Sequence, residues 1–246
     1  MPTQEAAIEF WNKLFAEGQN LKYRLVGFPD LDNPVLNAAL KHFGNVEGKR
    51  VLDLGCGNGA ASLFFAQHGA KVVSVDYSDV AIRNHAEFCQ SQNIDTITPV
   101  QLAAQDIPSL GSVDFVYGSM ILHHIEPFHE FATILRSTIR PGGKAFFHEN
   151  NATSRLLIWF RQNVVGKLWV PKYGDPDEFP LMPSEVDELR KHFDVQVFVP
   201  ELCFFQLISA YLLRGHLKRP FKLLDTFFYR FRPLRKWSYY QYLFLS

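Results

Sequence analysis

Cysteine is scarce in this chain, with three residues among 246. Cys56, Cys89 and Cys203 lie far apart, form no Cys-x-x-Cys pair and have no histidine at the spacing of a metal site. This scarcity argues against a disulfide-stapled domain and against a structural zinc site. We therefore expect reduced, buried cysteines and no metal.

Net charge and long apolar runs are lacking as well. Lys and Arg number 25, as do Asp and Glu, so the zero formal net charge points to no charged partner. No window of about eighteen residues is apolar and free of charge, which argues against a membrane-spanning helix. Because residues 1–7 contain no basic segment followed by an apolar run, we expect no secretory signal and a cytoplasmic location.

The most informative segment is Val51-Leu-Asp-Leu-Gly-Cys-Gly-Asn-Gly59. A short apolar strand that contains Asp53 runs into three alternating glycines, which let the backbone turn tightly and approach a ligand closely. A helix expected from about residue 58 would point its free N–H groups at that ligand. Asp76 ends a second apolar strand about twenty residues later, where a ribose-binding acid is expected. The pattern predicts a site for a nucleotide-like cofactor.

Two cofactor classes share this geometry. Gly55, Gly57 and Ala60 satisfy the dinucleotide fingerprint, which leaves an NAD(P)-dependent oxidoreductase open. Gly59 and Asp53 lie outside that fingerprint, and residues 52–59 instead resemble the first motif of class I S-adenosylmethionine-dependent methyltransferases. Four later blocks resemble the same family in the same order: Asp76-Tyr77-Ser78, Ala104 to Pro108, Val113 to His124 and Leu135 to Gly143.

The resemblance implies an α/β, Rossmann-like, doubly wound sheet of seven strands with an antiparallel last strand, all in one domain. Alternating patterns predict strands near 50–54, 71–76, 97–101, 113–118, 143–149, 195–199 and 237–245. Helices are expected near 58–68, 78–92, 127–139, 155–170, 203–214 and 220–230. Residues 1–48 would form a helical lid, 49–150 the cofactor-binding core, and 151–246 the acceptor-side helical insertions and closing strands.

The resemblance also implies which residues bind S-adenosylmethionine. The predicted cofactor-binding residues are Asp53, Gly55, Cys56, Gly57, Gly59, Asp76, Tyr77, Asp106, Ile107 and Ser119. In this interpretation Asp76 accepts hydrogen bonds from the ribose hydroxyls, Tyr77 stacks on the adenine and Asp106 accepts from its amine. Asp53 would organise the glycine loop or face the methionine amine. The alternative for each acid is an ordinary helix cap or an exposed loop charge.

Three histidines are candidates for a general base: His123, His124 and His148. They follow the fourth and fifth strands, close to where the methyl group is expected, and an imidazole accepts a proton near neutral pH. A positioning role is the alternative for each. The chain has no Asn/Asp-Pro-Pro-Tyr/Phe after strand four and no Pro-Cys dipeptide, which leaves a small-molecule acceptor methylated on oxygen or nitrogen.

One stretch, residues 214–236, is strongly basic, with eight Lys and Arg residues against Asp225 alone, interleaved with Leu, Phe and Tyr. This mixture suits a membrane surface or an apolar or anionic acceptor; nucleic acid is the less favoured partner. A solvated face over a buried aromatic face is the simpler alternative. The stretch also leaves open a non-catalytic module that binds an anionic membrane or a partner. The oligomeric state is not predicted.

Overall fold

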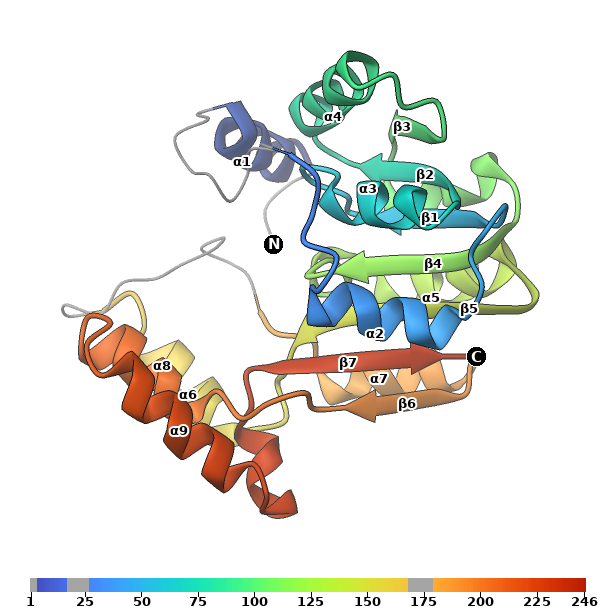
Figure 1. Ribbon diagram of the computed structural model, residues 1–246. Helices are drawn as coiled ribbons and strands as arrows, with labels where there is room; N and C mark the ends of the chain where they lie inside the picture. The colour runs from blue at the N-terminus through green and yellow to red at the C-terminus, as the bar shows by residue number, and fades with distance from the viewer. Residues whose placement is uncertain (1–3, 17–26, 168–178) are drawn as a thin grey trace.

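The computed structural model describes residues 4–16, 27–167 and 179–246. Seven strands form one sheet in the order β3-β2-β1-β4-β5-β7-β6 (Figure 1). They are β1 (Arg50–Leu54), β2 (Lys71–Asp76), β3 (Ile97–Gln101), β4 (Val113–Ser119), β5 (Ile139–Asn150), β6 (Val195–Phe198) and β7 (Tyr240–Leu245). The first five strands are parallel, and β7 lies antiparallel between β5 and β6. The predicted fold class is confirmed.

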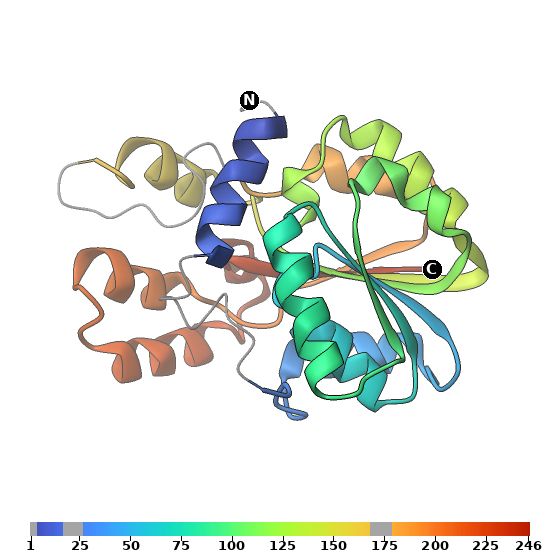
Figure 2. The same ribbon diagram turned by 90° about the horizontal axis from the view of Figure 1, so that it is seen from above.

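Helices cover both faces of this sheet (Figure 2). One layer holds α2 (Pro34–Phe43), α3 (Ala60–Gln67) and α4 (Asp79–Ser91), and the other holds α5 (Phe128–Thr138), α7 (Pro183–Arg190) and the 3-10 helix η2 (Ala104–Leu110). Because side chains alternate along a strand, Val51 joins the first core while Leu52 and Leu54 join the second. The sheet is therefore doubly wound.

The predicted lid of residues 1–48 divides into two parts. Leu36, Ala39 and Phe43 of α2 are buried against the sheet, so this helix is a layer of the core. α1 (Gln4–Ala16) lies near the carboxyl ends of the strands, beside α4 (Figure 1). Asn12 fixes it there, because its amide donates to Asp79 Oδ1 at 2.6 Å and its carbonyl oxygen accepts from Ser78 Oγ at 2.6 Å.

A separate group of helices follows β5 and β6: α6 (Arg155–Asn163), α8 (Phe204–Leu212), α9 (Lys218–Phe228) and the 3-10 helix η4 (Arg232–Trp237). α6, α8 and α9 overlap the expected helix ranges 155–170, 203–214 and 220–230, although α6 ends at Asn163 and residues 168–170 lie outside the described residues. β7 begins at Tyr240 and not at Trp237, because η4 occupies the preceding residues. No helix in the described part of the chain is both long and apolar enough to span a bilayer.

Candidate functional site

A cavity of about 930 Å³ opens at the carboxyl ends of the strands, around β1 and β4 where the strand order reverses. Open α/β sheets bind their ligands at this switch point. The volume is in the range of pockets that enclose a small ligand. The walls come from the glycine loop, the ends of β2, β4 and β5, the segment 102–105, and Trp11 and Phe15 of α1.

The glycine loop forms the floor of the cavity. Gly55, Gly57 and Gly59 all have left-handed backbones, with φ of 69°, 50° and 79°. The loop folds back over β2, since the N–H groups of Gly55 and Cys56 donate to the Val75 carbonyl at 2.8 and 2.9 Å. A Cβ on Gly55 would lie 2.7 Å from the Ile121 side chain. Glycine is therefore required there by both backbone conformation and space.

Asp76 holds this loop and faces the cavity. Its Oδ2 accepts from the Gly57 N–H at 2.9 Å, and its Oδ1 accepts from the Ser78 N–H at 2.9 Å. Burial raises the pKa of its carboxyl, and the two N–H donors oppose that rise. Each oxygen keeps a second lone pair, so the carboxylate can still accept from ligand hydroxyls. Tyr77 lines the cavity beside it.

Beneath the loop lies a buried polar chain. Asp53 and Ser74 are opposite each other on β1 and β2, and Ser62 of α3 joins them, with its Oγ 2.5 Å from Asp53 Oδ2 and 2.7 Å from Ser74 Oγ. Ser74 Oγ lies in turn 3.2 Å from His85 Nε2. Burial raises the pKa of Asp53 to about 7 and lowers the pKa of His85 to about 4. Asp53 thus ties β1 to α3, the helix that begins directly after the loop, and it also lines the cavity.

Gly59 packs directly on this polar chain. A Cβ at Gly59 would lie 2.0 Å from His85 Nδ1, and the imidazole is fully buried. We expect Gly59→Ala to lower the free energy of unfolding by about 2–4 kcal/mol, from left-handed backbone strain and overpacking together. Urea unfolding monitored by far-UV circular dichroism measures the loss.

Gly142→Ala is the matched control for this substitution. Gly142 has nearly the same backbone, with φ of 77°, but no atom lies within 4 Å of a Cβ built on it. We expect Gly142→Ala to lower the free energy of unfolding by about 1–2 kcal/mol, from the backbone strain alone. Equal losses in the two variants would show that His85 gives way without cost, contrary to this packing argument.

The exit of β4 meets the tip of β5 next to the glycine loop. The Met120 N–H donates to the His148 carbonyl at 2.8 Å, and Met120 itself has a left-handed φ of 56°. Such strain in a residue other than glycine is typical of functional sites. Ser119 Oγ lies 3.1 Å from His148 Nδ1, and both residues line the cavity. Burial lowers the pKa of His148, which leaves its imidazole neutral at pH 7.

Glu149 is fully buried and fastens the loop after β4. Its Oε1 accepts from the N–H groups of Ile121 and Leu122 at 2.8 and 2.7 Å, and its Oε2 lies 2.6 Å from His123 Nδ1. The His123 side chain is only 1% exposed, so the pair positions the loop. His124 follows in the 3-10 helix η3 (Leu122–His124), and its ring meets the edge of Trp11 at 5.6 Å between centroids.

The structure brings most of the predicted site residues together. The predicted residues that line the cavity are Asp53, Gly55, Cys56, Gly57, Asp76, Tyr77, Ser119, His123, His124 and His148. Gly59 lies below the floor, against His85. Asp106 is exposed and Ile107 is fully buried in the core, so neither lines the cavity. The reason is that η2 begins at Ala104, which turns residues 103–105 toward the cavity and the next two away.

The residues present fit S-adenosylmethionine. The carboxylates of Asp53 and Asp76 suit an amine and a ribose diol, Tyr77 offers a flat ring for adenine, and the glycines keep side chains off the floor. Sequence reasoning missed Met120, whose strain has no local signal, and the bracing role of Glu149. Among the described residues, no group of three His, Cys, Asp or Glu side chains is placed to hold a metal ion.

Comparison with proteins of known family supports a methyltransferase cofactor site in this cavity. Residues 30–174 match the profile of the methyltransferase domain family. The chain is 33% identical over 132 residues to the ubiquinone biosynthesis O-methyltransferase of Acinetobacter baylyi, covering 52% of this chain and 55% of that protein. It is 32% identical over 161 residues to the one of Idiomarina loihiensis, covering 63% and 65%. The matches thus span about half to two thirds of these relatives.

Solved structures share the fold. A putative sarcosine dimethylglycine methyltransferase from Galdieria sulphuraria has a TM-score of 0.61 at 12% identity, covering 96% of this chain and 97% of that one. The [4+2]-cyclase SpnF also has a TM-score of 0.61, at 14% identity, covering 99% and 96%. A likeness at such identities shows the fold alone. Because the family profile covers more than half of the chain, the chain belongs to the methyltransferase domain family, and its cofactor is S-adenosylmethionine.

Proposed function

We propose that this protein transfers the methyl group of S-adenosylmethionine to a hydroxyl oxygen of a small, apolar acceptor, giving S-adenosylhomocysteine. One observation carries the proposal: a single cavity joins the glycine loop and Asp76 to the Ser119–His148 pair. Oxygen is favoured over nitrogen because the curated relatives are named O-methyltransferases.

On the cofactor side, the chain's own groups bind and orient. The Asp76 carboxylate accepts from the ribose hydroxyls while it holds the Gly57 N–H, so cofactor binding and loop shape depend on the same group. Trp11 and Phe15 cover the loop from α1 and exclude water from the reacting atoms. Fixing donor and acceptor in line supplies much of the rate enhancement expected for a displacement at carbon.

On the acceptor side, His148 is the proposed general base. With Nδ1–H donated to Ser119 Oγ, the lone pair of Nε2 is left to accept a proton. The bound cofactor supplies an electrophilic methyl group. His148 Nε2 would take the proton that the acceptor hydroxyl gives up on methylation, while a cofactor held by the glycine loop and Asp76 would supply the methyl group. His123 is the poorer candidate, because its Nδ1 is engaged by Glu149 and its side chain is buried.

The cofactor half of the proposal is tested by thermal unfolding with S-adenosylhomocysteine. Ligand at a hundredfold over its Kd stabilises by about 2.7 kcal/mol, which raises the Tm by about 5–10 °C in a chain of this length. We expect the wild-type protein to show this shift. Asp76→Ala removes an acceptor for the ribose and frees the Gly57 N–H, so we expect the shift to vanish.

Asp95→Ala is the control, since Asp95 is an exposed acid that does not line the cavity. It should keep the full shift, and each variant is compared with its own ligand-free Tm so that lost stability is not mistaken for lost binding. NADH and NADPH form the second arm. A shift with a nicotinamide cofactor alone would overturn the proposal in favour of an oxidoreductase.

A further inference from the structure

The helices α6, α8 and α9 form a small unit at one side of the sheet (Figure 1), termed here the three-helix unit. Phe205 of α8 packs against Phe228 of α9 at 5.4 Å between centroids. Asp225 of α9 is buried and accepts from the N–H groups of Phe205 and Gln206, both at 2.9 Å. Phe160 joins α6 to α8 through Tyr211. Phe228 and Asp225 therefore mark the inner side of α9, and its opposite side faces outward.

The outer side of this unit is unusually apolar. Thirteen large apolar side chains are exposed in the described part of the chain, and eight of them belong to the three-helix unit or its connecting turns. They are Leu156, Trp159, Leu212, Leu217, Leu223, Leu224, Phe227 and Phe231. Leu223 is 70% exposed and Phe227 51%. Apolar side chains gathered in this way mark a binding surface.

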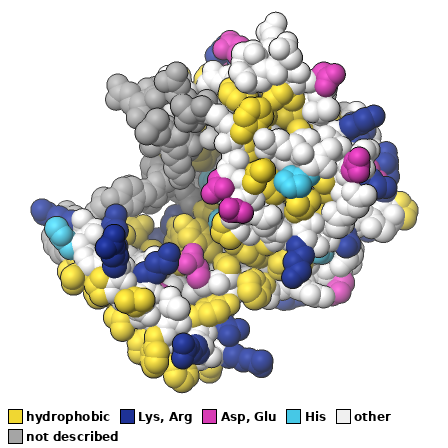
Figure 3. All heavy atoms as spheres, in the orientation of Figure 1, with side chains coloured by type: hydrophobic (Ala, Val, Ile, Leu, Met, Phe, Trp, Pro, Cys, Tyr) yellow, Lys and Arg dark blue, Asp and Glu magenta, His cyan; other side chains and the backbone are white. Residues whose placement is uncertain are grey.

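The same surface is strongly basic. Seven of the eight cations between residues 214 and 236 are exposed, namely Arg214, Lys218, Arg219, Lys222, Arg230, Arg232 and Lys236. The single acid, Asp225, is turned inward. No ion pair between described residues involves any of these cations. Figure 3 shows yellow apolar and dark blue basic side chains intermixed over α8 and α9, in a chain whose formal net charge is zero.

The turn between α8 and α9 shows a third feature. Arg214 and Leu217 both have left-handed backbones, with φ of 51° and 61°, and Leu217 is 56% exposed. A leucine in this conformation costs about 1–2 kcal/mol and gains no burial here in return. Contact of this turn with an apolar phase would offset the strain.

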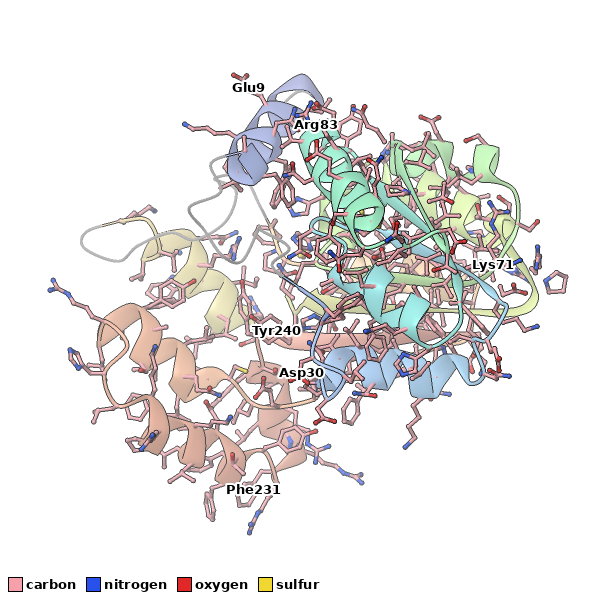
Figure 4. All side chains as sticks on the ribbon, turned by 45° about the horizontal axis from the view of Figure 1, so that its top comes forward. Glu9, Asp30, Lys71, Arg83, Phe231 and Tyr240 are labelled. Atoms are coloured by element: carbon pink, nitrogen blue, oxygen red, sulfur yellow. The ribbon has the colours of Figure 1, made fainter. Side chains whose placement is uncertain are left out.

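We propose that the three-helix unit docks on an anionic lipid bilayer. Lys and Arg would lie at the headgroups while Leu217, Leu223 and Phe227 enter the boundary with the acyl chains, as in interfacial amphipathic helices. A nucleic acid would contact the basic side chains but not the exposed leucines. An anionic lipid would contact both, through its headgroup and its acyl chains. Phe231 projects away from the sheet at the end of the unit (Figure 4).

The three-helix unit leads through η4 into β7, which lies beside β5 in the sheet. Tyr240, the first residue of β7 after the unit, packs its ring 5.0 Å from His148 (Figure 4). An apolar acceptor dissolved in the bilayer would then lie close to the proposed base. Membrane docking does not depend on the proposed methyl transfer, because vesicle binding is measured without cofactor or acceptor.

The test is flotation of the full chain with vesicles of phosphatidylcholine, with and without about one third phosphatidylglycerol. We expect binding to the anionic vesicles only, weakening as salt is raised from about 0.05 to 0.5 M. Each cation near the surface contributes about fivefold in affinity, so Lys218→Gln with Arg219→Gln should weaken binding about 25-fold. Leu223→Gln with Phe227→Gln should weaken it at least about tenfold.

Matched controls are Lys71→Gln and Leu31→Gln, which remove an exposed cation and an exposed leucine outside the unit. Lys71 lies on the sheet, remote from the three-helix unit (Figure 4). Both controls should bind like the wild type, and all variants should keep the Tm shift with S-adenosylhomocysteine. Equal binding to neutral vesicles would overturn the proposal. The proposal would also be overturned if light scattering showed that the chain forms a dimer through this surface and the chain did not bind vesicles.

Discussion

Replacing His148 with glutamine is expected to lower kcat by about 10²- to 10⁴-fold, the usual contribution of a general base. Glutamine fills much of the same space and can still meet Ser119 Oγ, but it accepts no proton. The KM for S-adenosylmethionine should stay unchanged, because β4 separates β5, which carries His148, from β1 and its glycine loop. Transfer of labelled methyl to an alkylphenol, used as a probe acceptor, measures both constants.

The dependence of rate on pH distinguishes a base from a positioning residue. Burial lowers the pKa of His148 below its ordinary value of 6.5, so the wild-type kcat should fall only as the pH drops below that value. His148→Gln should lack this acidic limb. His124→Gln is the control, since His124 lines the same cavity but packs on Trp11. If His124→Gln loses the limb while His148→Gln keeps it, the base is His124.

The central strands could be predicted closely from sequence. The expected ranges 50–54, 71–76 and 97–101 match β1, β2 and β3 residue for residue. These strands are short apolar runs whose ends are marked by charged or polar residues and by glycine, so local pattern defines them. β5 starts at Ile139 and not at 143, because pairing with β4 resumes across a register shift that no local pattern reveals.

Local pattern also predicted the residues on the cofactor side of the cavity. It did not predict the contacts between residues that are distant in the sequence. Gly55, Gly57 and Asp76 follow from spacing within one β-α-β unit, whose geometry is nearly fixed. Asp106 lies just outside the cavity lining, which ends at Gln105, because the start of the 3-10 helix decides which side chains face the cavity. The contact of Trp11 with His124 joins residues more than a hundred positions apart, and only the tertiary fold shows it.

The second large effect is expected on the free energy of unfolding when Glu149 is replaced. It is an ionisable residue near the end of β5, after the apolar residues 145–147, and it is fully buried. Its two oxygens serve Ile121, Leu122 and His123, so one side chain holds three consecutive residues of the neighbouring loop. Water cannot replace these bonds in a buried position, which makes the loss of the carboxylate costly.

We expect Glu149→Ala to lower the free energy of unfolding by about 3–5 kcal/mol, as for breaking a buried pair from one side. Two backbone N–H groups and the His123 ring would lose their acceptor together. Glu149→Gln keeps one carbonyl oxygen for the N–H groups of Ile121 and Leu122, so its loss should be smaller, about 1–3 kcal/mol. Urea unfolding at pH 7 gives both values.

The surface pair Glu130–His129 provides the comparison, with an N–O distance of 3.9 Å and both side chains more than half exposed. Glu130→Ala should stay within about 0.5 kcal/mol of the wild type, because solvent screens such a pair. If Glu149→Ala is equally mild, the loop after β4 is held by other contacts. Glu149 would then not be the residue that holds Ile121, Leu122 and His123 in place.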